Sequence, residues 1–294
     1  MTALLSPSQI EDAFVGACRA ELRAIKAGNV HIHAAGHDMD VEQFERAADA
    51  AAPHIANPAL RVGARVRLAV EASFAAAGCN TNLGILLLCA PIAAAAEATM
   101  ATTNISTRLS LMLTTLDTQD AEDAYRAISH ANPGGLGEVA TEDVSEPANV
   151  TLLEAMALAK DRDRIANAYV SNFTDVFDFA LPELAAARRV ERTEEDAIAN
   201  LHLKLLATFP DSHIARKYGI ERAEEIRAAA AALRPRLFPL TSRDARDRLL
   251  AFDASLKSER INPGTTADFV VATLFTDTII RRGRQPVAVS PLVE

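Results

Sequence analysis

The chain has 294 residues, a formal net charge of −9 and a 49% share of hydrophobic residues. This length suffices for one large domain or two of moderate size, each with a substantial core. The negative charge argues against a nucleic-acid or membrane-surface partner, because both require a basic face. Aromatic residues make up only 5% and alanine recurs in runs, a balance that favours helices over strands and predicts an all-α protein.

The N-terminal sequence and the cysteines indicate a cytoplasmic protein. The first residues, "MTALLSPSQIED", have no charged segment followed by a long apolar run, so we expect no signal peptide. The most apolar stretch, residues 83–96, is shorter than the roughly 20 residues that span a bilayer. Cys18, Cys79 and Cys89 have no metal-ligand spacing, and we expect them to be small core residues in a reducing compartment.

Helical periodicity runs through most of the chain. Ser6, Pro7 and Gln9 predict a capping box at the start of a helix that continues to Gly28, and Asp40 is expected to cap the next helix. Further helices are predicted at residues 58–77, 83–96, 107–116, 119–131, 150–161, 163–179, 181–188, 193–209, 219–233, 241–257 and 265–281.

The chain shows no repeat and no Gly/Ser linker. We therefore expect a single all-α, multi-helix domain over residues 1–282, followed by an irregular tail at 283–294. The longest segment without a helical pattern, residues 132–149, is expected to be a functional loop. The alanine-rich helices also allow a homodimer.

One polar segment, "AGNVHIHAAGHDMD" at residues 27–40, holds three histidines and two aspartates. It could be a metal site, a catalytic loop or a crowded polar turn. The spacing His-x-His-x-x-x-His matches no helical zinc motif, and hard cations prefer oxygen ligands. Mg²⁺ ligation by Asp38 and Asp40 is therefore favoured over ligation by the histidines, with His31 and His33 in structural roles.

A second polar segment, "NPGTTAD" at residues 262–268, precedes a predicted helix. Free backbone amides at such a start, with the hydroxyls of Thr265 and Thr266, could hold a phosphate, and Asp268 could bind Mg²⁺. The alternative is an ordinary helix that a threonine caps after a Pro-Gly turn. Both interpretations stay open on the sequence alone.

Two further polar segments, "GCNTNLG" and "DSHIARKYG", also lie at predicted helix junctions. The first offers side chains that could hydrogen-bond a base or ribose, or satisfy the backbone at a helix start: Asn80, Thr81 and Asn82. Glu71 would face the same end of the fold if the two neighbouring helices pack as a hairpin. In the second segment, Arg216 and Lys217 could pair with phosphate oxygens or belong to a charged surface.

The order of these segments resembles one protein family. "GNVHIHAAGHDMDVEQF", "NTNLG" and "NPGTTADF" are similar to the ordered motifs of the triphosphoribosyl-dephospho-CoA synthase family, from about residue 20 to 280. The resemblance implies transfer of 5-triphosphoribose from ATP to a ribose hydroxyl of dephospho-CoA, with release of adenine and formation of an α-glycosidic bond. It also implies Mg²⁺ with the ATP substrate, no tightly bound organic cofactor, and a small-molecule nucleotide and a hydroxyl acceptor as partners.

The resemblance further implies roles for individual residues. Cleavage of the C1′–N9 bond develops oxocarbenium character that a carboxylate can stabilise, and the acceptor hydroxyl needs a base. The residues expected at the catalytic centre, the aspartates also as Mg²⁺ ligands, are His37, Asp38, Asp40 and Asp268. The residues expected to bind the nucleotide are Lys26, Gly28, Asn29, Glu71, Asn80, Thr81, Asn82, Arg216, Lys217, Asn262, Gly264, Thr265 and Thr266.

The motifs also depart from the family pattern. Asn-Thr-His-Lys-Gly reads Asn-Thr-Asn-Leu-Gly at residues 80–84, Lys-Pro-Gly reads Lys-Ala-Gly at 26–28, and Ser-Pro-Gly-Gly reads Asn-Pro-Gly-Thr at 262–265. The acceptor therefore stays open. A ribitol-type acceptor in methanopterin-type cofactor biosynthesis is an alternative, with ATP or a phosphoribosyl diphosphate as donor. From other classes, the "HD" pair at 37–38 could mark a metal-dependent phosphohydrolase, or the chain could be a non-catalytic nucleotide-binding protein.

Overall fold

A computed structural model of the chain describes residues 5–34, 39–97, 104–132 and 146–284. Within these ranges the regular structure is helical, as the composition predicts, apart from an isolated bridge between His31 and Ala34. The α-helices are α1 (Pro7–Arg23), α2 (Val41–Ile55), α3 (Val62–Ala77), α4 (Leu83–Glu97), α5 (Ile105–Leu113), α6 (Thr118–Ala131), α7 (Leu152–Ala159), α8 (Arg164–Val170), α9 (Leu181–Val190), α10 (Glu194–Thr208), α11 (Ser212–Tyr218), α12 (Ile220–Leu233), α13 (Arg243–Ser258) and α14 (Gly264–Arg284). A π-helix, η1 (Asp175–Ala180), and a 3₁₀ turn, η2 (Arg234–Arg236), complete the set.

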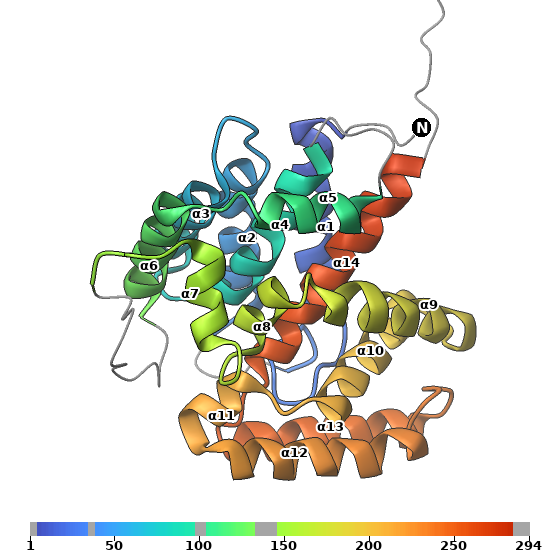
Figure 1. Cartoon of the computed structure of the whole chain (residues 1–294). Coiled ribbons are helices and arrows are strands. Elements are labelled where there is room, and N and C mark those ends of the chain that lie inside the picture. Colours follow the sequence, from blue (N-terminus) through green and yellow to red (C-terminus); the bar gives the residue numbers. More distant parts are fainter. Residues whose placement is uncertain (1–4, 35–38, 98–103, 133–145, 285–294) are drawn as a thin grey trace, which may run out of the picture.

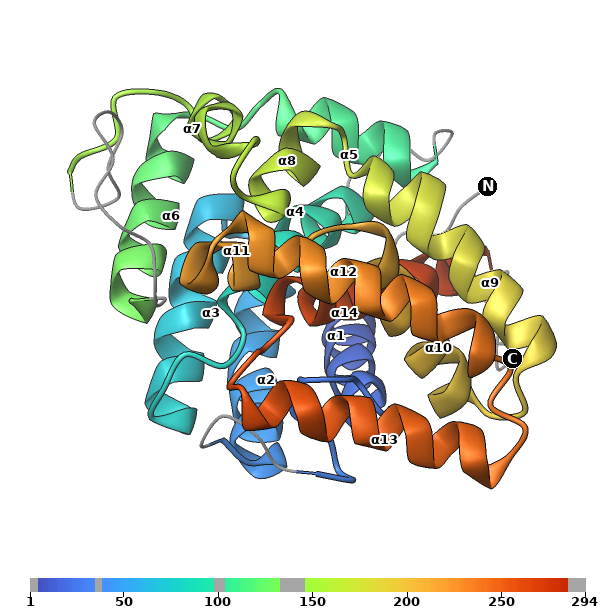
Figure 2. The ribbon, with the colours of Figure 1, turned by 90° about the horizontal axis from the view of Figure 1, so that it is seen from below.

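The long helix α14 runs through the middle of the molecule, and α1 packs along it (Figures 1 and 2). In both views α2, α3 and α6 lie on one side of this pair, and α9 and α10 lie on the other. The helices α12 and α13 lie at the lower end in Figure 1, where α14 begins. No helix in the described ranges is both long and apolar enough to cross a membrane.

Two hydrophobic clusters stabilise this arrangement, and α10 contributes to both. Ile198, Leu201 and Leu205 join the larger cluster, which contains most of α4 and α14. Leu203 and Leu206 join the smaller cluster with α12 and α13. Both faces of α10 are therefore buried. The single-domain organisation over residues 1–282 stays a prediction.

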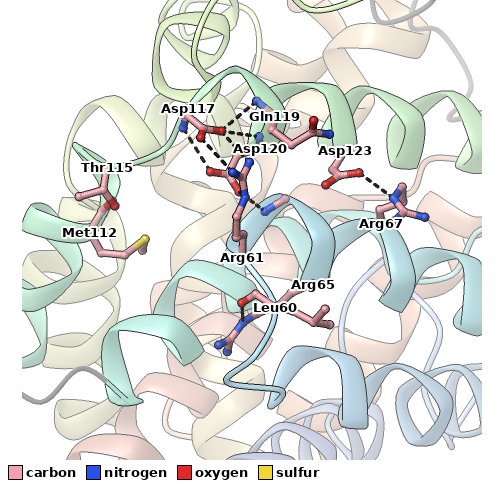
Figure 3. Close-up of polar contacts among 11 residues, drawn as sticks. Leu60, Arg61, Arg65, Arg67, Met112, Thr115, Asp117, Gln119, Asp120 and Asp123 are labelled. Carbon is pink, nitrogen blue, oxygen red and sulfur yellow. Dashed lines mark hydrogen bonds and ion pairs between the residues drawn. The ribbon is translucent and has the colours of Figure 1, made fainter.

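Polar contacts clamp α3 against α6 (Figure 3). The Gly63 amide donates to Asp120 Oδ1 (2.9 Å), and Arg67 pairs with Asp123 at 2.7 Å. Arg61 forms a two-pronged contact with Asp117, at 3.0 and 2.7 Å, and Asp117 caps the N-terminus of α6. The two helices approach so closely at Gly63 that a Cβ there would lie 2.4 Å from the Asp120 carbonyl oxygen.

The helix starts agree with the capping residues of the sequence. Ser6 and Gln9 form the predicted capping box of α1, and Asp40 caps α2 through the amide of Gln43 (2.8 Å). Of the cysteines, Cys18 and Cys89 are buried as expected, whereas the expectation is wrong for Cys79, which is partly exposed. The predicted loop at 132–149 lies mostly outside the described residues.

Several helix bounds differ from the prediction, each for a local reason. The first helix ends at Arg23 instead of Gly28, because the following residues form a turn in which Gly28 has a φ of 81°. The predicted helix at 163–179 is interrupted, because Asn172 and Phe173 adopt positive φ and bury the Phe173 ring. The polar segment at 211–219 contains a short helix, α11, that the sequence interpretation missed, and α14 extends to Arg284, past the predicted start of the tail.

We expect Gly63→Ala to lower the free energy of unfolding by about 2 kcal/mol, because the new methyl group meets backbone atoms of Asp120 that cannot rotate away. Urea denaturation measures this. Gly16→Ala in α1 is the control, because a Cβ there has no neighbour within 4 Å. The control should be neutral or slightly stabilising, and an equal loss in both variants would contradict the close contact.

A second stability prediction concerns His202 on α10, which is buried with no hydrogen-bond partner for either ring nitrogen among the described residues. Burial lowers its pKa from 6.5 to about 3, so the folded state keeps it neutral while the unfolded state binds a proton. Stability should therefore fall as the pH drops below 6.5, with about 3 kcal/mol lost through this residue at pH 4.5. His202→Leu should remove that part of the acid sensitivity. The measurement is the free energy of unfolding of the wild type and of His202→Leu as a function of pH, and the same pH dependence in both would contradict the lowered pKa of His202.

Candidate active site

A cleft of about 1210 Å³ opens where α14 begins. Polar side chains from all four predicted polar segments line it. These side chains come from the turn after α1, the turn between α3 and α4, helix α11 and the start of α14. Residues far apart in the sequence therefore meet in one site, as the resemblance predicts.

The turn after α1 docks on the segment that precedes α14. The Asn29 side-chain amide donates to Asn262 Oδ1 (2.8 Å), and both residues line the cleft. Gly28 packs so tightly that a Cβ would lie 2.8 Å from Pro263 Cδ, and its amide donates to Asp253 Oδ1 (2.8 Å). Gly28 thus allows the turn after α1 to contact the segment before α14. It is not among the residues that line the cleft.

Lys26 supports this turn from beneath. Its side chain is fully buried, forms an ion pair with Glu21 and donates to Asn29 Oδ1 at 2.9 Å. Burial lowers the pKa of Lys26 and raises that of Glu21, because both charges are removed from water, and their mutual attraction opposes both shifts. Lys26, which the sequence assigned to nucleotide binding, therefore lies behind the cleft, whereas Glu21 lines it.

A carboxylate already occupies the N-terminus of α14. Asp211 is buried, and its Oδ2 accepts hydrogen bonds from the amide (2.7 Å) and hydroxyl (2.8 Å) of Thr266. Its Oδ1 accepts the amides of His213 and Ile214 at the start of α11. The amide and hydroxyl of Thr266, which were predicted to bind phosphate, therefore donate to a carboxylate of the protein itself. The negative charge of Asp211 disfavours a second anion at this helix start.

Asp268 lies at the contact between α14 and α4. A Cβ at Gly84 would lie 2.0 Å from Asp268 Oδ2 and 2.8 Å from Ile165 Cδ1, so only glycine admits this contact. The Asp268 carboxyl lines the cleft, with no hydrogen bond or ion pair to the residues that the structure describes. Burial raises its pKa well above the usual value, and the negative charges of Asp211, Glu21 and Asp163 add to this shift.

The turn between α3 and α4 presents three amide and hydroxyl side chains to the cleft. Asn80 Oδ1 accepts the Leu83 amide (3.3 Å) and thereby satisfies the start of α4, which is the structural alternative left open by the sequence. Thr81 Oγ1 and Asn82 Nδ2 are buried and have no hydrogen-bond partner among the described residues. These two groups remain available to a ligand.

Cations gather on the part of the cleft formed by residues 160–164 and α11. Arg216 pairs with Asp163 (3.1 Å), whereas Lys160, Arg162 and Lys217 are exposed and have no ion pair with any described residue. The sequence interpretation found Arg216 and Lys217 but missed Lys160 and Arg162. The charged run "KDRDR" at residues 160–164 could have indicated them, because it lies at a helix junction as the other polar segments do.

A different part of the cleft carries aromatic and apolar side chains from α2, α3 and α6. Phe74 and His130 form an edge-to-face pair with ring centroids 4.9 Å apart, and Phe44 and Ile128 line the cleft with them. The clamp between α3 and α6 in Figure 3 fixes this wall, because it ties together the helices that carry Phe74 and His130. Apart from Phe44, which ends the first family motif, no sequence motif pointed to these residues.

The structure brings most of the predicted nucleotide-binding residues to one cleft and excludes a few. Those that line it are Asn29, Asn80, Thr81, Asn82, Arg216, Lys217, Asn262, Gly264 and Thr265, and Asp268, which was predicted at the catalytic centre, lines it as well. Glu71 pairs with Arg67 on α3 (3.0 Å) and does not line the cleft, and Asp40 uses its carboxylate to cap α2. His37 and Asp38 lie outside the described residues.

The family of the protein follows from a comparison with known sequences. A model of the ATP:dephospho-CoA triphosphoribosyl transferases matches residues 7–286. The chain belongs to this family. The match covers the whole helical region, so the recognition from the three ordered motifs is confirmed.

Two known proteins are similar to this chain, one in part of its sequence and one in its fold. A Stutzerimonas stutzeri (strain A1501) protein that carries the name 2-(5''-triphosphoribosyl)-3'-dephosphocoenzyme-A synthase is 30% identical over 115 residues, which is 39% of either chain. A crystal structure from Archaeoglobus fulgidus, which carries the name of a triphosphoribosyl-dephospho-CoA synthase, matches with a TM-score of 0.63 and 24% identity. The match covers 80% of this chain and 97% of that one, and it confirms the all-α fold.

Two of the departures from the family motifs have different consequences in the structure. Asn82 and Leu83 stand where the family pattern has histidine and lysine, and both line the cleft. Ala27 stands where the pattern has proline and is buried in the smaller hydrophobic cluster. The first departure changes the chemistry offered to a ligand, and the second changes only the packing.

We expect Lys26→Met to lower the free energy of unfolding by about 3 kcal/mol, because it leaves Glu21 buried without its cation. The double variant Glu21→Gln/Lys26→Met should recover most of this loss, since it removes both charges. Arg19→Ala, which breaks an exposed pair with Asp49, should cost less than about 1 kcal/mol. If Lys26→Met unfolds in urea like the wild type, the buried pair is not formed in solution.

Proposed function

We propose that this protein transfers a triphosphoribosyl group from ATP to a hydroxyl acceptor such as dephospho-CoA, with release of adenine and formation of an α-ribosyl bond. Family membership supports the class of reaction. The observation that carries the proposal is the distribution of side chains in the cleft: cations on one part, aromatic and amide groups on another, and the Asp268 carboxyl at the α4–α14 contact. A nucleoside triphosphate has the same three-part chemistry.

The triphosphate would lie on the cations of residues 160–164 and α11. Lys160, Arg162 and Lys217 have no ion pair with described residues, so their charges are available to a ligand. The start of α14 is a poorer phosphate site than the sequence indicated, because Asp211 already accepts the Thr266 amide. Charge-assisted hydrogen bonds from lysine and arginine are the strong contacts that a polyphosphate requires.

Asp268 would face the reacting C1′ atom. Leaving of the base develops positive charge on the ribose, and a carboxylate within a cluster of other acids stabilises that charge. Burial and the neighbouring carboxylates raise the pKa of Asp268, because they oppose a further negative charge. A cation that enters the site reverses this balance and favours the ionised form. The predicted acid-base roles of His37 and Asp38 are kept as part of the proposal.

Mg²⁺ would enter with the nucleotide. No group of three His, Cys, Asp or Glu suited to a metal ion occurs in the described part of the chain. That fits an ion that proteins usually hold through one or two carboxylates together with substrate phosphates and water. Asp268 is a described carboxyl that could supply a ligand, since it faces the cleft with no hydrogen bond to described residues. The ion would neutralise phosphate charge as the ribosyl bond breaks.

The proposal is tested by incubation of the purified protein with ATP and Mg²⁺ and a panel of acceptors, with chromatography for free adenine. Dephospho-CoA and a ribitol-type alcohol belong in the panel, because the changed residues 82 and 83 line the cleft. Phosphoribosyl diphosphate serves as the alternative donor. We expect adenine release that depends on an acceptor and stops with EDTA.

Asp268→Asn should lower kcat for adenine release at least about 100-fold while the protein stays folded, because the amide cannot stabilise positive charge at C1′. Asp247→Asn, an exposed carboxyl on α13 with 64% side-chain exposure, is the matched control and should retain full activity. Unchanged release in Asp268→Asn would contradict the placement of the reaction. No release with any donor and acceptor would contradict the function itself.

A further inference from the structure

Asn82 lies in the cleft wall with half of its side-chain amide unused. The residue is only 6% exposed, and its Oδ1 accepts a hydrogen bond from the Ser73 hydroxyl (2.7 Å). This bond orients the amide plane. The amide nitrogen, Nδ2, has no partner among the described residues, although the side chain lines the cleft. A buried donor without an acceptor is unfavourable, so a ligand atom is the expected partner.

The surroundings of Asn82 suit a flat heteroaromatic ring. Ser73 precedes Phe74 in α3, and Phe74 forms the edge-to-face pair with His130. The neighbouring Thr81 hydroxyl is also buried without a partner among the described residues. Hydrogen-bond donors beside an apolar, aromatic wall match the edge and face of a base, whereas they lack the positive charge that a phosphate requires.

The order of contacts along the cleft gives the same placement. A Cβ at Gly84, two residues after Asn82, would meet both Asp268 Oδ2 (2.0 Å) and Ile165 Cδ1 (2.8 Å), so Asp268 and Ile165 converge on the same point of α4. Ile165 directly follows the charged run at 160–164 and Gly84 closely follows Asn82, so Asp268 lies close to both the cationic part of the cleft and the turn that carries Asn82. A nucleotide with its phosphates on the cations and its C1′ at Asp268 therefore places its base against Asn82.

We propose that Asn82, oriented by Ser73, donates a hydrogen bond to a ring nitrogen of the purine of the donor nucleotide. The inference rests on the proposed use of a nucleotide and specifies how its base is recognised. When the C1′–N9 bond breaks, its electron pair stays with the purine, and the N–H group of Asn82 stabilises that added negative charge. The amide transfers no proton. Ser73 is a positioning residue that keeps the donor side of the amide toward the base.

Equilibrium binding tests this directly, because it does not depend on turnover. The Kd of ATP with Mg²⁺ is measured by calorimetry for the wild type and for Asn82→Asp and Asn82→Ala, and then repeated with 1-deaza-, 3-deaza- and 7-deaza-ATP. We expect Asn82→Ala to weaken ATP binding about 10-fold. Asn82→Asp should weaken it further, because the variant keeps the shape but replaces the N–H donor with an acceptor.

The analogues identify the partner atom. One of the three should bind the wild type about 10-fold more weakly than ATP, and the same analogue should show no further loss with Asn82→Ala. Ser73→Ala should give a smaller loss with the same analogue dependence. Asn57→Asp, on the exposed turn between α2 and α3, is the control and should bind all four nucleotides like the wild type.

Two outcomes would overturn the inference: equal affinity of Asn82→Ala and wild type for ATP, or additive losses between Asn82→Ala and every analogue. If ATP binds with the expected analogue pattern but adenine is never released, the base site stands and the proposed transfer fails. If adenine is released but Asn82 variants bind all analogues like the wild type, the transfer stands and the base site fails.

Discussion

Close contact at the start of α14 is the constraint on which the site depends. Three glycines allow it: Gly84 admits the Asp268 carboxyl, Gly28 admits Pro263, and Gly264 admits the imidazole of His213, 2.8 Å from where a Cβ would lie. At each of these positions a side chain would meet atoms that the site needs. The segments that contain Gly28, Gly84 and Gly264 are thus held together by packing, because the lack of a side chain at each glycine allows a residue of another segment to approach it closely.

Burial determines how charge is distributed around the cleft. Lys26, behind the cleft, forms an ion pair with Glu21, which lines it, and Asp211 accepts backbone amides at the N-termini of both α11 and α14. These groups are used inside the protein, where an unpaired charge would be costly. Lys160, Arg162 and Lys217 remain exposed to solvent, and so an acidic protein with a net charge of −9 still presents a local positive surface to an anionic ligand.

The sequence predicted local features well where the cause was local. The capping box at Ser6, the cap at Asp40 and the apolar helix α4 depend on residues within a few positions of one another, so their patterns are readable. The break at Asn172 and Phe173 was not readable, because the burial of the Phe173 ring in the core overrides the helical pattern.

The sequence by itself determined the helical class, the family and the set of polar segments that build the cleft, because helix propensity, capping and motif order are properties of the chain. Only the tertiary structure decided which of those polar groups face a ligand. Thr266 and Lys26 bind buried carboxylates, whereas Asn82 Nδ2 and the Asp268 carboxyl have no hydrogen-bond partner among the described residues and belong to side chains that line the cleft. Partners of this kind lie up to 55 residues away in the chain, and no local pattern encodes them.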